Sequence, residues 1–163
     1  IDHGEISPKL YELKPNDQLL IRGPFGMFSI KEPKEETVFV AAGTGIAPLR
    51  SMLHDLLEKH PEKKATLIFG FRHEEDFFFK EEFEKLKSEY KNFTLIPTIT
   101  KPKPNWNGFK GRVTDIIPKV LSVSDQNIYI CGPNQMINDT LDVLIRKMGF
   151  KKEQTHIERW TNK

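Results

Sequence analysis

The fold is decided by residues 37–48, Thr-Val-Phe-Val-Ala-Ala-Gly-Thr-Gly-Ile-Ala-Pro. The first six residues form a near-continuous apolar run, which is typical of a strand buried on both faces of a parallel sheet. Two glycines follow at once, and apolar residues then recur at helical spacing from Leu49 to Leu57. The stretch therefore predicts a buried strand, a tight glycine-rich turn and a helix.

The same alternation continues along the rest of the chain. Further strands are predicted at 66–71, 93–99, 127–131 and 155–160, and further helices at 80–91, 113–121 and 136–149, the last ended by Gly149. Strands that alternate with helices imply crossover connections and a parallel sheet covered on both faces. We therefore predict an α/β fold over residues 36–163, with a doubly wound, parallel five-stranded sheet of Rossmann-like type.

Residues 1–35 have a different pattern. Two short β-like runs, 19–21 and 27–30, are separated by Gly-Pro-Phe-Gly at 23–26, and a polar linker follows at 31–36. We expect a strand–turn–strand unit here, which is too short to be a domain of its own.

Composition excludes several classes of function. The 163 residues carry 25 Lys and Arg against 23 Asp and Glu, so the formal charge of +2 argues against a nucleic-acid binder. No apolar run approaches the ~20 residues of a membrane span. The single cysteine, Cys131, excludes a disulfide framework and a cysteine-only metal site, and the five histidines form no close pair. We expect a cytoplasmic protein without a metal.

The turns after the strands are the candidate functional residues, because such sheets bind ligands beyond the carboxyl ends of their strands. In Gly43-Thr44-Gly45, glycines let the backbone approach a phosphate, and the following helix directs its positive end there. Pro48 is tolerated in the first helical turn, and no Gly-Lys-Ser/Thr of a Walker motif follows. A plain tight turn is the alternative.

Two later segments of the chain also contain candidate functional residues. Cys131-Gly132-Pro133 turns the chain sharply into a helix and places Cys131 at the end of a strand, where the alternative is a small buried hydrophobe. Near the end of the chain, alternation puts Glu158 and Trp160 on one face. The Trp160 ring is suited to stacking, or else to a place in the core.

Taken together, these turns resemble one family. Gly-x-Gly-x-x-Pro at 43–48, Cys-Gly-Pro…Met at 131–136 and Glu-x-aromatic at 158–160 occur in the order found in the ferredoxin–NADP reductase superfamily of flavoenzymes. Gly4-Glu5-Ile6-Ser7 is similar to the family's Gly-x-x-Ser flavin-phosphate motif, whereas its Arg-x-Tyr-Ser/Thr flavin motif is absent. The resemblance implies an NAD(P)-binding domain at 36–163, preceded at 1–35 by the C-terminal remnant of an FAD-binding β-barrel.

The resemblance also implies an activity. In the family, NAD(P)H delivers hydride to FAD, which passes electrons singly to an iron–sulfur or haem partner. By this resemblance Thr44 points toward the nicotinamide, Cys131 lies near its C4 atom and Glu158 lies at the flavin edge. The implied cofactor-binding residues are Gly4, Ser7, Gly43, Thr44, Gly45, Pro48, Arg72, Asp76, Thr100, Lys101, Cys131, Gly132, Pro133, Met136 and Trp160.

The choice of nucleotide stays open at this point. Arg72 and Lys101 follow two strands and suit a 2′-phosphate, which favours NADP. The acidic run at 74–76 suits a ribose 2′-hydroxyl, which favours NAD. Two alternative functions remain: the reductase module of a multicomponent oxygenase or hydrogenase, and a nucleotide-binding module without turnover.

Overall fold

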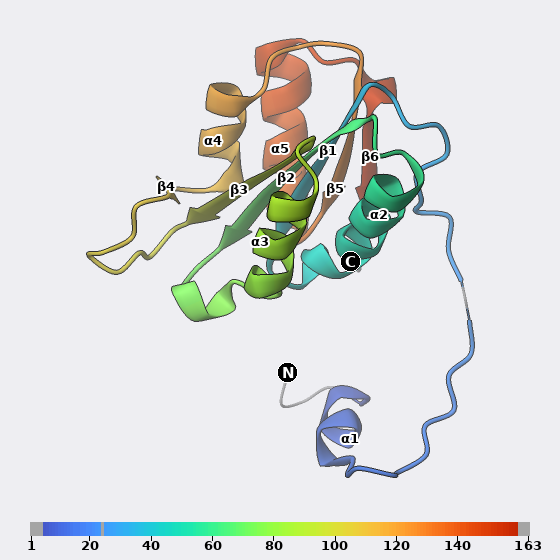
Figure 1. Cartoon of the computed structure of the whole chain (residues 1–163). Helices are drawn as coiled ribbons and strands as arrows, with labels where there is room; N and C mark the ends of the chain where they lie inside the picture. The colour runs from blue at the N-terminus through green and yellow to red at the C-terminus, as the bar shows by residue number, and fades with distance from the viewer. Residues whose placement is uncertain (1–4, 24, 160–163) are drawn as a thin grey trace.

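The computed structural model describes residues 5–23 and 25–159, and its centre is a parallel sheet of six strands in the order β4-β3-β2-β1-β5-β6 (Figure 1). The strands are β1 Glu36–Ala42, β2 Lys64–Phe71, β3 Phe93–Ile99, β4 Phe109–Lys110, β5 Gln126–Cys131 and β6 Thr155–Glu158. The helices are α1 Ser7–Glu12, α2 Ile46–Lys59, α3 Lys80–Glu89, α4 Val113–Val120 and α5 Asn134–Leu141.

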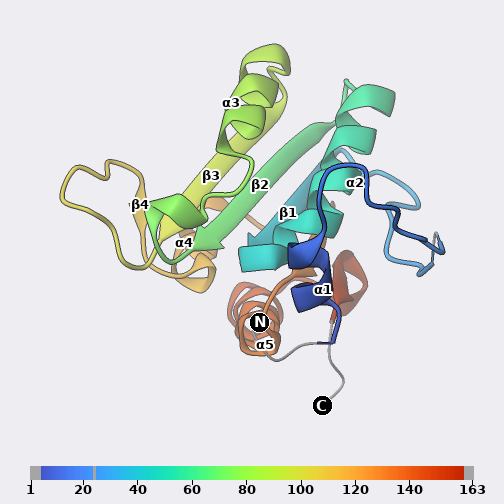
Figure 2. The same ribbon diagram turned by 90° about the horizontal axis from the view of Figure 1, so that it is seen from below.

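Helices cover both faces of the sheet, as the unbroken apolar runs require. Figure 2 shows α2 and α3 on one side and α4 and α5 on the other. Alternate residues of β1 face the two sides: Phe39 and Ala41 belong to the core under α2 and α3, and Val38 and Val40 to the core under α4 and α5. The predicted α/β doubly wound architecture is confirmed.

The order of the strands creates one crevice. From β1 the chain moves outward through β2 and β3 to β4, and α4 then returns it to β5 on the other side of β1. The connections after β1 and β5 therefore leave in opposite directions, and a gap opens between them at the carboxyl edge of the sheet.

The prediction of five strands was wrong by one. The additional strand, β4, has only two residues, which pair with Thr98 and Ile99 of β3. Both β4 residues are exposed, so no apolar periodicity marks them. Instead the strand depends on long-range hydrogen bonds, from Gly111 N to the Ile99 carbonyl at 2.9 Å and from Thr98 Oγ1 to the Gly111 carbonyl at 2.8 Å.

The long helix predicted up to Gly149 is formed in two parts. The regular turns of α5 pass into a wider, π-helical segment, η3, at Asp142–Met148. Gly149 then ends the helix in the left-handed conformation, with φ 87°.

The expected strands before residue 36 are not formed within the described residues. The first element is instead α1, which lies apart from the sheet in Figure 1. In the described residues the runs at 19–21 and 27–30 pair neither with each other nor with the sheet, and Leu20 and Met27 are 98% and 80% exposed. A two-stranded unit without a buried apolar face is at best marginally stable. The assignment of residues 1–35 to a barrel remnant stays a prediction.

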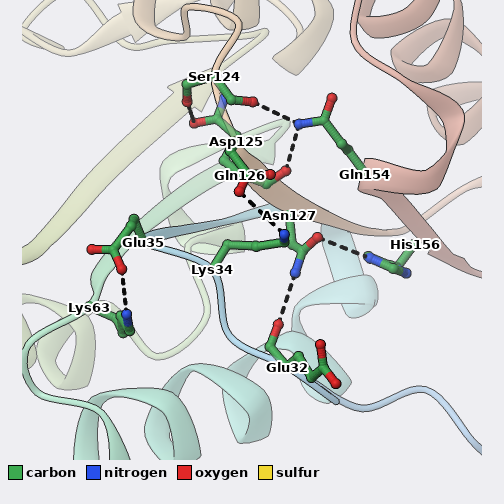
Figure 3. A network of polar contacts seen from close by, with 10 residues as sticks. All are labelled: Glu32, Lys34, Glu35, Lys63, Ser124, Asp125, Gln126, Asn127, Gln154 and His156. Atoms are coloured by element: carbon green, nitrogen blue, oxygen red, sulfur yellow. Dashed lines mark hydrogen bonds and ion pairs between the residues drawn. The ribbon is translucent and has the colours of Figure 1, made fainter.

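The segment 27–35, here called the strap, leads into β1 and is fastened to the sheet (Figure 3). Asn127 Nδ2 of β5 donates to the Glu32 carbonyl at 3.1 Å. Lys34 pairs with Asp125 at 3.2 Å, and Lys63 pairs with Glu35 at 2.6 Å. The strap therefore enters the domain along β5.

Candidate nucleotide-binding site

A cavity of about 280 Å³ opens at the crevice between β1 and β5. Its lining comes from the turns after these two strands: Ala42, Gly43, Thr44, Gly45, Gly132, Pro133 and Asn134. Two turns almost 90 residues apart in the sequence thus meet at one place. Of the predicted site residues, Gly43, Thr44, Gly45, Gly132 and Pro133 are brought together here.

The close approach of the two turns requires glycine. A Cβ on Gly45 would collide with the carbonyl group of Cys131, and a Cβ on Gly132 would lie 3.2 Å from the Ala42 carbonyl oxygen at the end of β1. Gly43 has φ 54°, a conformation that glycine adopts without steric cost. The glycines therefore bring bare backbone to the edge of the cavity, which is what close contact with a phosphate requires.

Two helices begin at this cavity. A 3₁₀ turn, η1 Gly43–Gly45, leads directly into α2, and Pro133 precedes α5. Helix amino ends carry unpaired N–H groups and a partial positive charge. None of the seven described residues that line the cavity has a charged side chain. The arrangement suits an anion held by backbone N–H groups.

Three predicted residues lie around the cavity without lining it. Cys131 is fully buried and belongs to the core under α2. Met136 is half-buried, and its sulfur accepts a hydrogen bond from Thr140 Oγ1 at 3.4 Å. Pro48 is the third residue of α2. Cys131 thus takes the position that the sequence offered as the alternative, a small buried side chain, and its role at the nicotinamide stays a prediction.

The loops after β2 and β3 lie side by side. Thr100 N donates to the Phe71 carbonyl at 3.1 Å, and Lys101 N donates to the Arg72 carbonyl at 2.9 Å. Glu74 reaches across, since its Oε1 accepts from Lys103 N at 3.3 Å. The predicted residues Arg72, Thr100 and Lys101 are therefore neighbours along the same edge of the sheet.

Asp76 has a local structural role in this edge. Its carboxylate accepts a hydrogen bond from His73 N at 2.9 Å and so caps the short turn η2 Glu74–Asp76. Its predicted contact with a cofactor stays a prediction.

Glu158 lies at a second cavity, of about 640 Å³, between the strap and the sheet. This residue ends β6 and pairs with Cys131 in the register of the sheet. The cavity is also lined by Tyr129 and His156, whose rings stack with centroids 4.6 Å apart. Burial and the neighbouring Lys31 charge lower the pKa of His156, and burial raises the pKa of Tyr129.

The remaining predicted residues are not placed at either cavity. Gly4 and Trp160 lie outside the described residues. Ser7 begins α1, away from the sheet (Figure 1). The described residues therefore do not assemble the predicted flavin-phosphate motif beside the cavity.

Sequence reasoning missed Asn134 and its partner. Asn134 is the first residue of α5 and lines the cavity, and Arg159 Nη1 donates to its Oδ1 at 3.5 Å. Arg159 also donates to Asn138 Oδ1 at 2.6 Å and so links the residue after β6 to α5. The position of Asn134, directly after a Gly-Pro turn that begins a helix, is the signal that identifies it.

Within 5–23 and 25–159, no three or more His, Cys, Asp or Glu side chains are grouped so that they could hold a metal ion. In this part of the chain, no helix combines the length and apolarity needed to cross a bilayer.

Comparison with known proteins places this geometry in a family. Residues 39–142, which contain both turns of the cavity, match the family described as the oxidoreductase NAD-binding domain. The chain belongs to this family. The resemblance to the ferredoxin–NADP reductase superfamily, which the ordered motifs indicated, is confirmed. The domain is therefore an oxidoreductase NAD-binding domain by family.

Similar proteins are considerably longer. A subunit of the Na(+)-translocating NADH-quinone reductase of Neisseria gonorrhoeae is 32% identical over 158 residues, which covers 92% of this chain and 39% of the relative. The solved CS-b5R domains of human Ncb5or, in the NAD+ form, superpose with a TM-score of 0.84 at 26% identity, covering 96% of this chain and 46% of that one. The Amycolatopsis cytochrome P450 reductase GcoB gives a TM-score of 0.77 at 26% identity, covering 85% and 43%. The chain therefore spans about two fifths of the length of the curated relatives.

Proposed function

We propose that this domain binds NADH at the carboxyl edge of the sheet and presents its nicotinamide for hydride transfer to a flavin. The observation that carries the proposal is the cavity at the crevice between β1 and β5, with bare glycine backbone and two helix amino ends around it. These groups suit the pyrophosphate or the adjoining nicotinamide ribose, because both need hydrogen-bond donors and close approach of the backbone.

In this proposal, residues of this chain bind the nucleotide and orient its nicotinamide. Thr44, exposed on η1 and lining the cavity, is the residue we assign to the nicotinamide, and the backbone from Gly132 to Asn134 lines the opposite wall. Glu158, at the end of β6, is the group we assign to the flavin edge. FAD, when bound, would accept the hydride and pass the electrons on singly. An iron–sulfur or haem partner is proposed as the acceptor.

NADH is proposed over NADPH for two reasons. The N. gonorrhoeae relative belongs to an NADH-quinone reductase, and the human structure was solved in its NAD+ form. In this chain the Glu74 carboxylate bridges the loops after β2 and β3, where a 2′-phosphate would meet its negative charge.

A second candidate is the reductase component of a multicomponent system. Two similar proteins favour it, since one is a subunit of an NADH-quinone reductase and the other is a cytochrome P450 reductase. A cytoplasmic location is part of both proposals and rests on the cysteine usage and on the NADH substrate.

Calorimetric titration of the chain with NAD+ and NADP+ tests the proposal. We expect NAD+ to bind at least tenfold more tightly than NADP+, and Arg72→Ala to change the affinity for NAD+ less than threefold. Tighter binding of NADP+ that is lost in Arg72→Ala would reverse the assignment of the nucleotide. Binding of neither nucleotide would contradict the proposed function of this chain.

A further inference from the structure

A hydrogen-bonded ion pair joins α2 to α3, the two helices that cover one face of the sheet. Arg50, in the second turn of α2, donates from Nε to Glu82 Oε1 at 2.7 Å and from Nη2 to Glu82 Oε2 at 2.8 Å. Glu82 lies in the first turn of α3, and its side chain is 27% exposed. Paired parallel hydrogen bonds of this kind fix direction as well as distance.

Two further residues complete this contact, here called the clamp. His54, one turn after Arg50, places Nε2 2.5 Å from Glu82 Oε1. On the other side, the Phe79 ring lies 4.6 Å from the Arg50 guanidinium carbon. Phe79 has φ 59°, which is rare for a bulky residue and persists only where the surroundings hold it.

The clamp holds a full negative charge on Glu82. Burial raises the pKa of this carboxyl, but the hydrogen bonds from Arg50 and His54 outweigh that effect and leave its pKa below the ordinary value. Near neutral pH, Glu82 is therefore ionised and available to both partners on α2.

The two helices that the clamp joins carry different parts of the site. One turn before Arg50, α2 begins at η1, which lines the cavity. Ahead of α3, the chain passes through Arg72 and η2, the loop where we expect the adenosine end of the nucleotide. A dinucleotide that spans both subsites needs the two helices at a fixed separation, whereas a mononucleotide contacts only one of them.

We propose that Glu82 is a positioning residue that sets the separation of the two halves of the dinucleotide site by holding Arg50. This inference rests on the proposed function, because it assumes that NADH spans the edge from β1 to β2. Glu82 has no part in the chemistry; it acts through α2 and α3. A partly exposed ion pair adds little to stability, so its removal is expected to affect binding more than folding.

The test compares a whole dinucleotide with its halves. In Glu82→Gln we expect the affinity for NAD+, measured calorimetrically, to fall about tenfold. The affinities for AMP and nicotinamide mononucleotide, measured by NMR titration, are expected to stay within twofold of wild type, because each half senses one subsite only. Thermal unfolding of each variant is followed in parallel.

Two further variants serve as a control and as a conservative substitution. Glu89→Gln is the matched control, since it removes a carboxylate of α3 that pairs with Lys85 of the same helix at 3.7 Å and joins no second helix. It is expected to bind NAD+ as wild type does. Arg50→Lys keeps the charge but not the paired geometry, and it is expected to weaken NAD+ binding by an intermediate factor.

The outcomes separate the two hypotheses. Unchanged NAD+ binding in Glu82→Gln would overturn the inference. Equal weakening of NAD+, AMP and nicotinamide mononucleotide, with a lower melting temperature, would also overturn it, because that result indicates a merely structural role. A wild-type chain that binds AMP but not NAD+ would instead contradict the proposed function.

Discussion

At the scale of single residues, the site depends on glycines, which have no side chain. Gly45 and Gly132 let the turns after β1 and β5 touch, and the cavity exists because their backbones approach so closely. Cys131 is buried and Asp76 caps a turn, so neither of these side chains lines the cavity. The functional edge of this domain is built mainly from main-chain groups.

Gly45→Ala tests this dependence. The added methyl group would collide with the Cys131 carbonyl, so η1 must move away from β5. We expect the affinity for NAD+ to fall at least tenfold and the free energy of unfolding to fall by about 1–3 kcal/mol, the usual cost of overpacking. Calorimetry and urea denaturation measure the two effects.

The control for this variant is Gly149→Ala. Unlike Gly45, whose φ is −61°, Gly149 has a positive φ of 87°, but a Cβ there would meet open space, and the residue lies at the far end of the helix that begins at the cavity. It is expected to lose about 1 kcal/mol of stability through strain alone and to bind NAD+ normally. If Gly149→Ala weakened binding as much as Gly45→Ala, general destabilisation would explain both.

Sequence reasoning succeeds at this scale where a residue's role follows from the chain next to it. The turns at Gly43-Thr44-Gly45 and Gly132-Pro133 were identified because each follows a buried strand and precedes a helix. Asn134 was missed because its importance depends on β1 lying beside β5. The bond from His73 N to Asp76, three residues apart, is by contrast a local contact, and it leaves the predicted contact of Asp76 with a cofactor as a prediction. Contacts made by tertiary pairing are the part that sequence patterns do not contain.

At the scale of elements, the main strands and helices were predictable because their apolar runs are long. The two failures share one cause. The strand β4 forms through pairing with β3, whereas the described residues at 19–21 and 27–30 pair neither with each other nor with the sheet. Strand formation at the edges of a sheet is decided by the neighbour rather than by propensity.

The strap is the element whose attachment can be measured most directly. Asn127 is 9% exposed and donates to the Glu32 carbonyl, whereas the Lys34–Asp125 pair is mostly exposed. We expect Asn127→Ala to lower the free energy of unfolding by about 1–3 kcal/mol, because it leaves the Glu32 carbonyl without this donor.

Lys34→Ala provides the contrast. An exposed ion pair contributes about 0–1 kcal/mol, so this variant is expected to unfold close to wild type in urea. Equal losses in Asn127→Ala and Lys34→Ala would show that the surface pair fastens the strap as much as the buried amide does, contrary to this expectation.

At the scale of the whole molecule, the chain has two regions of unlike character. From Glu36 onward, strands and helices enclose two continuous cores. In the segment before the strap, α1 has no buried residue, and large apolar side chains such as Tyr11, Leu20 and Phe25 are 92%, 98% and 79% exposed. A surface of this kind marks a region that normally packs against another partner. This fits the proposal that residues 1–35 belong to a flavin-binding barrel.

Removal of residues 1–26 tests this division. The shortened chain keeps the strap, both cores and the cavity, so its free energy of unfolding is expected to change by less than about 0.5 kcal/mol, with NAD+ affinity within twofold. Self-association, followed by sedimentation, is expected to decrease, because the exposed apolar side chains of α1 and of residues 19–25 are removed. A loss of more than about 2 kcal/mol would mean that the segment packs against the sheet in solution. Its apolar side chains would then belong to the core of this domain rather than to a partner's.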